Sequence, residues 1–502
     1  MWPMIRRIIA RADVTTEMGT GHLMRCRSLA QRLKDFGVST EFLMAECPGE
    51  LRKTLIDEGF DFVRVNCAPG GIKDAKFTAR AAAGADWIIV DGYHFDGSYQ
   101  KALKSAGMRV LFVDDYVHCR GYPADIVLNQ NMYANSTMYR DKAPRSKILT
   151  GPSYALLRAE FAAKRPGYRR VPRIAKNILV TLGGSDKGNL TARVVRALDR
   201  SRFKNLEVRV VVGAINLNAE EIVRICAESK KKMKVLVNIG NMAEMMDWAD
   251  LAISAGGTTA YELAITTTPS VMLVSAENQR LNAAEFCKRG FAQIVEDPFR
   301  AADNELIECF DSIISSSQRR KKMVARLKGV VDGHGPERVL MNMEGSDIWM
   351  RRAENEDSKM ILRWANDDET RKMSYTTANI SLETHATWFD AKLKDPSCML
   401  LIGMDTFDSP VGSARIESRG QCGTLSIIID PKDRGRGYGP QMIAMACRMG
   451  ANILGLKDFD AFVKKVNTPS LRAFEKCGFK LISSEMIQGE ESYHMTLEAN
   501  EE

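Results

Sequence analysis

The sequence lacks any apolar run long enough to cross a membrane and any sign of a secretion signal. No stretch approaches the roughly 20 consecutive apolar residues that a membrane helix needs. The first residues carry Arg6 and Arg7 inside a short apolar run and no small-residue cleavage site, which predicts a first strand rather than a signal peptide. We therefore expect a soluble cytoplasmic protein with no membrane partner.

Metal-binding and nucleic-acid-binding patterns are also missing. The 11 cysteines form no CxxC pair, and the 6 histidines never fall at metal-ligand spacing with them. We expect reduced thiols and no structural zinc. The net charge of +8 is modest, and the basic run 319–322 is short and has no interleaved aromatic residues, so nucleic acid is not an expected partner. Small anionic molecules, nucleotides above all, suit this composition better.

The chain of 502 residues predicts roughly three domains. Short apolar strands alternate with helices from Ile5 to about Val180, and again from 177 to 331, which is typical of parallel α/β sheets. The expected strands are 8–13, 87–91, 110–114, 177–182, 208–212 and 251–254, and the expected first helix is 21–36. The basic, proline-containing stretch 164–174 and the segment 333–347 are plausible boundaries. We predict domains at residues 1–165, 166–345 and 346–502.

Two glycine-rich turns predict phosphate-binding sites. Gly256-Gly257-Thr258-Thr259 follows the strand 251–254, and Glu262 lies one turn inside the next helix. The second turn, 434–439 (RGRGYG), follows an apolar run at 425–430. Each can aim free backbone N–H groups and a positive helix end at a phosphate. The first pattern, at 256–259, equally fits an ordinary glycine-rich helix start.

A third turn, Gly19-Thr20-Gly21-His22, follows the first expected strand and places a histidine at the start of a helix. The histidine either faces a ligand or merely caps the turn. Asp114 and Asp115 are adjacent carboxylates at a strand end, but neighbours on a strand point to opposite faces, so we do not expect them to share a metal ion.

Eight motifs carry a family resemblance over roughly residues 5–340. They are RADxxxxxGTGHxMR (11–25), VDGY (90–93), VDD (113–115), LNQN (128–131), GPSYALLRAEF (151–161), LGGSDxxNLT (182–191), SAGGTTxYE (254–262) and ENQ (277–279). This part of the chain resembles the nucleotide-sugar hydrolases of pseudaminic acid synthesis. The resemblance implies two Rossmann-like domains of GT-B type. It also implies metal-free hydrolysis of UDP from UDP-2,4-diacetamido-2,4,6-trideoxy-β-L-altropyranose by attack of water at the anomeric carbon.

The resemblance assigns roles to residues of this chain. His22 would be the general base or orient the attacking water, which suits the near-neutral pKa of a free histidine. Asp13 would orient His22 or a sugar hydroxyl. The other implied substrate-binding residues are Gly21, Tyr93, Arg158, Asn278 and Gln279 for the sugar nucleotide, Gly257, Thr258 and Thr259 for the diphosphate, and Glu262 for the ribose.

The last 155 or so residues resemble GNAT-type N-acetyltransferases, a mixed α/β fold. The turn 434–439 matches RxxGxG, the pyrophosphate loop of the family, and residues 467–479 match its NxxSxxxYExxGF pattern. The resemblance implies acetyl-CoA as co-substrate, held by Arg434, Gly435, Gly437, Gly439, Asn467 and Ser470. It implies no metal.

This domain departs from the family pattern at two places. Phe474 stands where many members have a tyrosine that protonates the departing thiolate, and no glutamate base is evident at 424–429. Tyr438 and Cys477 are two candidates to replace this acid. Each also has a simpler interpretation as a packing or loop residue, and we favour that interpretation. His385 and Trp388 lie three apart in a segment that resembles acetyltransferases of UDP-4-amino sugars; they either contact substrate or pack the core, and packing is favoured.

The two parts predict one pathway, because the acetyltransferase would make the sugar that the hydrolase consumes. We expect a bifunctional enzyme of pseudaminic acid biosynthesis that acetylates N4 of a UDP-4-amino-4,6-dideoxy-AltNAc sugar and then releases UDP. One alternative is a GT-B glycosyltransferase fused to an N-acyltransferase of other specificity. Another is a non-catalytic sensor of nucleotide sugar and acyl-CoA. The sequence does not identify a protein partner.

Overall fold

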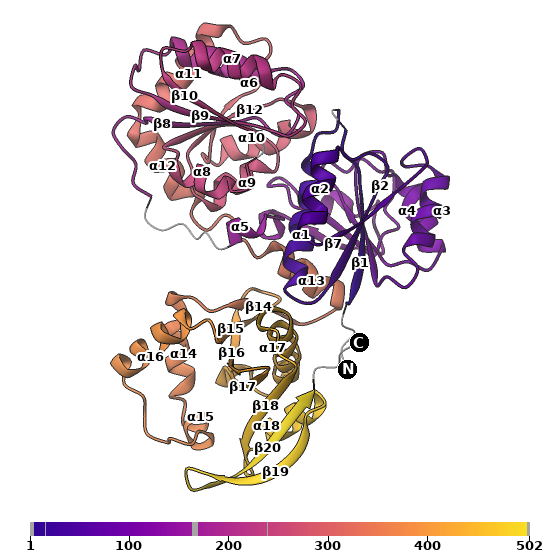
Figure 1. Ribbon diagram of the computed structural model, residues 1–502, viewed down its shortest axis with the longest axis vertical. Helices are drawn as coiled ribbons and strands as arrows, with labels where there is room; N and C mark the ends of the chain where they lie inside the picture. Colours follow the sequence, from indigo (N-terminus) through magenta and orange to yellow (C-terminus); the bar gives the residue numbers. More distant parts are fainter. Residues whose placement is uncertain (1–4, 16, 163–168, 238, 499–502) are drawn as a thin grey trace. The chain divides into compact units, whose positions relative to one another are not determined.

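The structure, a computed structural model, describes residues 5–15, 17–162, 169–237 and 239–498. These residues form two compact units. One unit contains residues 6–31 and 39–336 and holds two parallel sheets; the other contains residues 337–498 with Ile5 and residues 32–38, and holds a mixed sheet (Figure 1). Within the described ranges no helix is both long and apolar enough to span a bilayer.

The first sheet has seven parallel strands in the order β3-β2-β1-β4-β5-β6-β7. Its strands are nearly continuous apolar runs because helices cover both faces, α1 and α2 on one and α3 and α4 on the other (Figure 1). The strands are β1 (Arg7–Ala12), β2 (Ser39–Met44), β3 (Asp61–Arg64), β4 (Trp87–Asp91), β5 (Val110–Val113), β6 (Ile126–Asn129) and β7 (Lys147–Thr150). The helices are α1 (Gly21–Lys34), α2 (Gly49–Asp57), α3 (Ile72–Ala81), α4 (Gly97–Ser105), η1 (Ser136–Tyr139), η2 (Pro152–Tyr154) and α5 (Ala159–Ala162).

The second sheet has six parallel strands in the order β10-β9-β8-β11-β12-β13. One apolar core lies under α6, α7 and α11, and another lies under α8, α9 and α10 on the opposite face (Figure 1). The strands are β8 (Asn177–Thr181), β9 (Glu207–Val212), β10 (Lys232–Val237), β11 (Leu251–Ala255), β12 (Ser270–Leu273) and β13 (Gln293–Val295). The helices are α6 (Leu190–Arg200), α7 (Ala219–Glu228), α8 (Met242–Trp248), α9 (Thr259–Ile265), η3 (Glu277–Gln279), α10 (Arg280–Lys288), α11 (Asp303–Ser315) and α12 (Ser317–Leu327).

The mixed sheet has the order β14-β15-β16-β17-β18-β20-β19, and only β17 and β18 pair in parallel. Helix α17 packs on one face, and α14 and α16 cover part of the other. The strands are β14 (Ile348–Arg352), β15 (Cys398–Asp405), β16 (Pro410–Arg419), β17 (Cys422–Ile429), β18 (Asp458–Lys464), β19 (Lys480–Ile487) and β20 (Glu490–Glu498). The helices are α13 (Gly335–Glu344), η4 (Asn355–Asp357), α14 (Ser358–Ala365), α15 (Asp368–Met373), α16 (Leu382–Lys394), η5 (Pro431–Asp433), α17 (Tyr438–Leu454) and α18 (Thr468–Lys476).

The expected fold class, two Rossmann-like domains followed by a mixed α/β domain, is confirmed, and the expected strands lie within a few residues of the observed ones. The expected boundary at 165/166 falls in residues 163–168, outside the described residues. The segment 333–347 is not irregular: most of it is helix α13, because buried residues such as Val339 and Met343 give it a core-facing side. The proposed domain limits stay a prediction.

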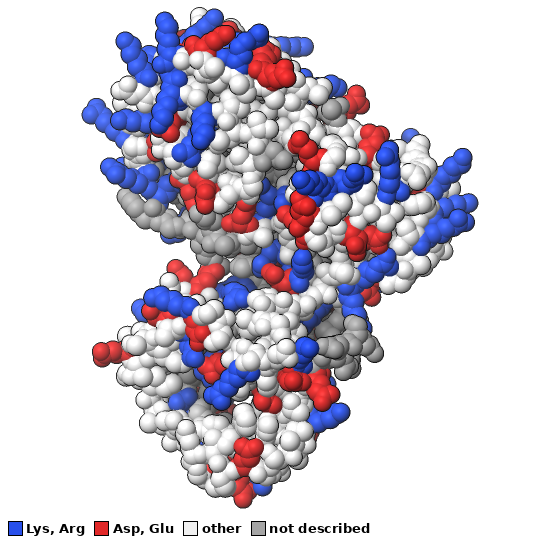
Figure 2. Space-filling view, viewed as in Figure 1, with Lys and Arg blue, Asp and Glu red and all other residues white. Residues whose placement is uncertain are grey.

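Charge is unevenly spread over the visible face in Figure 2. Lys and Arg gather over the part of the molecule where α7, α11 and α12 lie, and elsewhere they alternate with Asp and Glu. The basic run 319–322 belongs to α12. Within this run Arg320 is fully buried and hydrogen-bonds backbone carbonyls, so the run is partly structural.

Candidate active sites

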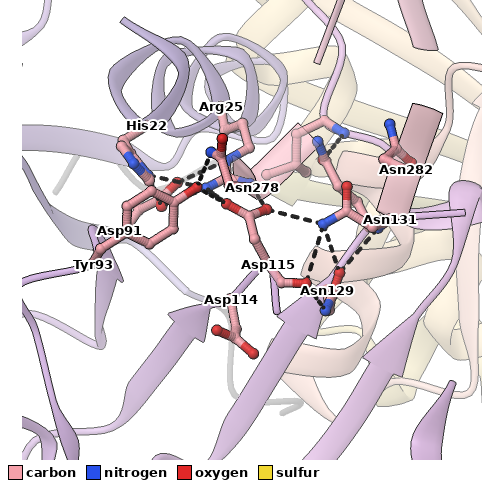
Figure 3. Close-up of polar contacts among 12 residues, drawn as sticks. His22, Arg25, Asp91, Tyr93, Asp114, Asp115, Asn129, Asn131, Asn278 and Asn282 are labelled. Carbon is pink, nitrogen blue, oxygen red and sulfur yellow. Dashed lines mark hydrogen bonds and ion pairs between the residues drawn. The ribbon is translucent and has the colours of Figure 1, made fainter. Parts of the chain in front are cut away.

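His22 is held by a carboxylate at the carboxyl end of the first sheet. It is the second residue of α1, and its Nδ1 lies 2.6 Å from Oδ1 of Asp91, the last residue of β4 (Figure 3). Both side chains are almost fully buried. Arg25 Nη2 also lies 3.1 Å from Nδ1, but the shorter contact with the Asp91 carboxylate favours the tautomer that leaves Nε2 as a proton acceptor. The described residues offer Nε2 no hydrogen bond.

Arg25, one turn further along α1, binds two carboxylates at once. Its Nη2 and Nε donate to Asp91 at 2.7 and 3.0 Å, and its Nη1 donates to Asp115 at 2.5 Å. Burial lowers the pKa of Arg25, but the two carboxylates outweigh burial and hold its pKa well above the ordinary value. The guanidinium therefore stays charged and fixes the carboxylate that orients His22.

Asp115 links Arg25 to residues from both parallel-sheet domains. Its Oδ2 accepts a hydrogen bond of 2.6 Å from the Tyr93 hydroxyl, which in turn accepts one of 2.7 Å from Asn278 Nδ2 (Figure 3). Burial raises the pKa of Asp115, but the charge and hydrogen bond of Arg25 more than offset this and hold it below the ordinary value. The edge of the Tyr93 ring packs against His22, with 4.5 Å between ring centroids. Tyr93 and Asn278, both expected at the sugar pocket, thus lie at the histidine.

Asp13 does not orient His22. Its Oδ1 accepts the backbone N–H groups of Ala45 and Glu46, and its Oδ2 binds Arg11 and lies 3.0 Å from His94 Nε2. Asp13 does not orient the histidine, because Asp91 occupies that position. Asp13 Oδ1 stabilises the loop after β2, its Oδ2 contacts Arg11 and His94, and the alternative that Asp13 orients a sugar hydroxyl stays a prediction.

Asp114 and Asp115 point apart (Figure 3). Asp114 accepts hydrogen bonds from Tyr122 and Tyr139 and lies 2.7 Å from His118 Nδ1, whereas Asp115 faces Arg25. The expected opposite orientation is confirmed. Among the residues that the structure describes, no group of three His, Cys, Asp or Glu side chains is arranged to hold a metal ion.

The turn after β11 presents unpaired backbone donors. The N–H groups of Gly257, Thr258 and Thr259 have no protein partner in the described part of the chain, and α9 begins at Thr259. Gln279, expected to touch substrate, uses its Oε1 to accept from Gly256 N at 3.2 Å and from Ser275. Gln279 therefore shapes the turn. The free N–H groups of the turn can bind an anionic group, and binding of a diphosphate there stays a prediction.

Asn282 supports the same turn and was not foreseen. It is buried, donates to the Gly256 carbonyl at 3.1 Å, and accepts from the Tyr261 hydroxyl at 2.6 Å. Its carbonyl also accepts from Met132 N at 3.2 Å, which connects the turn to the segment after β6. The sequence signal that could have pointed to Asn282 is its position one helical turn after Asn278.

Arg158 and Glu262 form an ion pair. Glu262 Oε1 lies 2.9 Å from Arg158 Nη2, and Arg158 Nη1 lies 3.1 Å from Glu160. Burial lowers the pKa of Arg158, and the two glutamates more than compensate, so its pKa is raised. Glu262 retains Oε2, which has no recorded hydrogen bond to the described residues, for a ligand hydroxyl. Gly21 is the first residue of α1, and a Cβ added to it would meet no other atom within 4 Å. Its role as a substrate contact stays a prediction.

The turn before α17 fits a pyrophosphate. Gly435 and Gly437 have φ of +79° and +84°, conformations that glycine adopts without strain. Gly437 caps α17 with no side-chain partner, the first turn has no acidic residue, and the N–H groups of residues 437–439 have no recorded protein partner among the described residues. Gly439 matches the family loop, where glycine would make room for the pyrophosphate, but a Cβ at this position would meet Ala473 and Ile427 at 3.8 Å, inside the protein. Room for the pyrophosphate therefore does not explain Gly439, and its contact with coenzyme A stays a prediction.

Arg434 is tied back to the protein. Its guanidinium binds Glu369 at 2.8 Å and also Asp367 and Thr370 at the start of α15. Asn467 caps α18 by accepting from Ser470 N at 3.2 Å. The observed contacts of Arg434 and Asn467 are thus structural, and any contact of these residues or of Ser470 with coenzyme A stays a prediction.

Phe474 is a core residue, buried and packed edge-on against Phe479. The Cys477 thiol donates a hydrogen bond to the carbonyl of Pro440, which belongs to α17. Burial raises the pKa of this thiol to about 11. His385 is buried, lies 2.9 Å from the Ser358 carbonyl through Nε2 and stacks on Phe389, so the packing interpretation of His385 is confirmed. Trp388 lies beside it, with 5.4 Å between the two ring centroids.

The main residues missed by sequence reasoning are Asp91, Arg25 and Asn282. The first two stand inside the quoted motifs VDGY and GTGHxMR, but only the fold shows that both converge on His22.

Comparison with known families agrees with this architecture. Residues 347–480 match the Acetyltransferase (GNAT) domain, and residues 177–334 match the Glycosyltransferase family 28 C-terminal domain. An uncharacterized protein of Methanocaldococcus jannaschii is 24% identical over 94% of this chain and 96% of its own length.

Two further relatives match a smaller share of this chain. The spore coat polysaccharide biosynthesis protein SpsG of Bacillus subtilis is 28% identical over 65% of this chain and 95% of its own length. The UDP-2,4-diacetamido-2,4,6-trideoxy-beta-L-altropyranose hydrolase of Campylobacter jejuni is 22% identical over 57% of this chain and 97% of its own. The predicted fusion of a region similar to this hydrolase with a GNAT acetyltransferase domain is confirmed, and the chain is an enzyme with two catalytic parts. The GNAT domain implies use of an acyl-CoA.

Proposed function

We propose that this enzyme catalyses two consecutive steps of pseudaminic acid biosynthesis. It transfers acetyl from acetyl-CoA to the 4-amino group of UDP-4-amino-4,6-dideoxy-β-L-AltNAc and then hydrolyses the product to UDP and the free diacetamido sugar. The observation that carries the proposal is the buried pair of His22 and Asp91, with Nε2 of the histidine left as a proton acceptor. Similarity to the Campylobacter jejuni hydrolase supports the choice of sugar.

In the hydrolytic step His22 Nε2 takes a proton from water as the water oxygen bonds to the anomeric carbon. The bond from that carbon to the diphosphate oxygen breaks, and UDP leaves with the electron pair. Asp91 stabilises the imidazolium that forms, and Arg25 keeps Asp91 in place. The unpaired N–H groups of residues 257–259 stabilise the growing negative charge on the diphosphate.

In the transfer step the turn at 435–439 would hold the pyrophosphate of acetyl-CoA against the start of α17. When bound, acetyl-CoA supplies the acetyl group as a thioester. Phe474 has no proton to give, so the departing thiolate takes its proton from water or from the substrate nitrogen. Proximity and orientation of the amine then provide most of the acceleration.

A second candidate is a glycosyltransferase acting on a UDP-sugar, favoured by the match of residues 177–334 to the family 28 C-terminal domain. A glycosyltransferase needs an acceptor alcohol before it releases UDP, whereas a hydrolase needs only water.

The test follows free CoA and UDP in one tube with the purified chain, UDP-4-amino-4,6-dideoxy-β-L-AltNAc and acetyl-CoA. We expect CoA to appear first and UDP to follow without any added acceptor. Release of CoA without UDP would favour the glycosyltransferase, and binding of both ligands without either product would favour the sensor.

A further inference from the structure

The mixed sheet opens between β17 and β18. The two strands pair over only three residues, and Thr424 opposite Asp460 is the last pair before they separate. Beyond this point the edge of β17 that faces the opening has unpaired backbone groups, which an extended amide ligand could satisfy. Because β17 leads directly to the turn at 435–439, a ligand anchored there and running back along β17 ends near Thr424 and Asp460.

A polar cluster lies at this point, on the sheet face opposite α17. Asp460 Oδ1 lies 2.9 Å from Nε2 of His494, which belongs to the neighbouring strand β20. Cys422 of β17 donates its thiol to Asp460 Oδ2 at 3.1 Å. Burial raises the pKa of Asp460, and the contacts with His494 and Cys422 outweigh it and lower the pKa, so the carboxyl group stays ionised.

His494 is held in a fixed plane, and its Nδ1 neither accepts nor donates a hydrogen bond within the described residues. Phe462 stacks on its ring at 4.6 Å with 15° between the planes. When Nε2–H donates to Asp460, Nδ1 carries a lone pair, and the nearest charged group, Glu485 Oε1 of β19, stands 3.6 Å away, beyond hydrogen-bond distance. Asp460, Glu485 and, through Asp460, Cys422 are the titratable groups that face this histidine among the described residues.

We propose that Asp460 and His494 form the amine site of the acetyltransferase: Asp460 attracts the ammonium group of the acceptor, and His494 takes the proton that the amine must lose. This inference rests on the proposed acetyl transfer. The site is reachable, because His494 and Asp460 are 22% and 26% exposed. The cluster also supplies the base that is missing from residues 424–429.

The step balances as follows. The ammonium gives one proton to His494 Nδ1, the neutral nitrogen forms a bond to the thioester carbonyl carbon, and the carbon–sulfur bond breaks. The thiolate receives the second nitrogen proton and leaves as the CoA thiol, and His494 returns its proton to solvent. Asp460 and Glu485 stabilise the transient imidazolium.

The test compares His494→Gln and Asp460→Asn with the full-length wild type. Acetylation of UDP-4-amino-4,6-dideoxy-β-L-AltNAc and of glucosamine is measured by thiol release from pH 5.5 to 9, and acetyl-CoA affinity by calorimetry. We expect kcat/KM to fall about 100-fold in His494→Gln, because glutamine cannot take the proton from the amine. Asp460→Asn should lower kcat/KM at every pH. Acetyl-CoA affinity should not change.

Glu491→Gln is the matched control, since Glu491 lies on the opposite face of β20 from His494, and its exposed side chain forms an ion pair with Lys465. It should behave as the wild type. A His494→Gln variant that binds acetyl-CoA and keeps the wild-type rate and pH profile would overturn the inference, as would a wild type that binds acetyl-CoA and acetylates neither amine. His494-dependent acetylation of glucosamine alone would support this amine site while refuting the proposed sugar.

Discussion

At the scale of single residues, the proposed hydrolase site is a chain of hydrogen-bonded side chains. His22, Asp91, Arg25 and Asp115 follow one another at contacts of 2.5–2.7 Å, and all are largely buried. Each buried charge has an opposite partner, which offsets the cost of removing it from water. The consequence is a histidine whose orientation does not depend on a ligand.

Asp91→Asn should reduce UDP release about 100- to 1,000-fold. An amide cannot stabilise the imidazolium, and its N–H₂ group facing Nδ1 would move the histidine proton to Nε2. Acetyl transfer should be unchanged. The measurement is UDP release from the diacetamido sugar nucleotide, with exposed Asp57→Asn as control. Wild-type UDP release in a folded Asp91→Asn variant would remove Asp91 from the mechanism.

Asp115→Asn tests the ion pair with Arg25 through pH. The pKa of Asp115 is lower in the folded chain than its ordinary value of about 3.9, so the pair contributes stability above that pH and loses it as pH falls. We expect the variant to be less stable by about 3 kcal/mol at pH 7. The measurement is urea unfolding of the wild type and the variant at pH 7 and pH 3. The difference between their free energies of unfolding should be smaller at pH 3. A difference that stays constant would mean that the charge is not its source.

At the scale of elements, both sites lie where a strand ends and a helix begins. β11 leads to α9, β17 leads to α17, and in each case the intervening turn leaves backbone N–H groups free. The two turns are built differently. Gln279 and Asn282 fix the first from the side, whereas positive φ angles at Gly435 and Gly437 shape the second.

Gly437→Ala and Gly439→Ala are a matched pair for the second turn. Alanine at 437 must adopt φ near +84°, which costs about 1–2 kcal/mol and distorts the turn, whereas at 439 its Cβ meets only ordinary contacts. We expect acetyl-CoA affinity to drop about tenfold in Gly437→Ala and to remain near wild type in Gly439→Ala. Calorimetric titration with acetyl-CoA measures both. Equal weakening would restore the idea that Gly439 makes room for the pyrophosphate.

At the scale of the whole molecule, two catalytic parts share one chain but use separate residues. None of the residues placed at the hydrolase site belongs to the mixed sheet or to its turns. A defect in one part should therefore leave the other active.

His22→Ala should abolish UDP release and keep acetyl transfer, and Gly437→Ala should slow acetyl transfer at limiting acetyl-CoA and keep UDP release from acetylated substrate. Mixed in one tube, the two full-length variants should together convert the amino sugar nucleotide to UDP at a restored rate, because the acetylated product diffuses between chains. The measurement is UDP formation from the unacetylated substrate. No restoration, with each variant active in its own step, would indicate that the intermediate does not leave the chain.

The sequence by itself determined the fold class and the two glycine-rich turns, because strand and helix periodicity and a glycine-rich stretch between a strand and a helix are local properties. It also placed His22, Tyr93 and Asn278 correctly near one another through a family resemblance. Only the tertiary structure assigned Asp91 rather than Asp13 to His22, tied Arg158 to Glu262, and brought Asp460 and His494 together from different strands. Such pairs join residues 34 to 104 positions apart, and their distance is set by how strands order within a sheet, which no local pattern encodes.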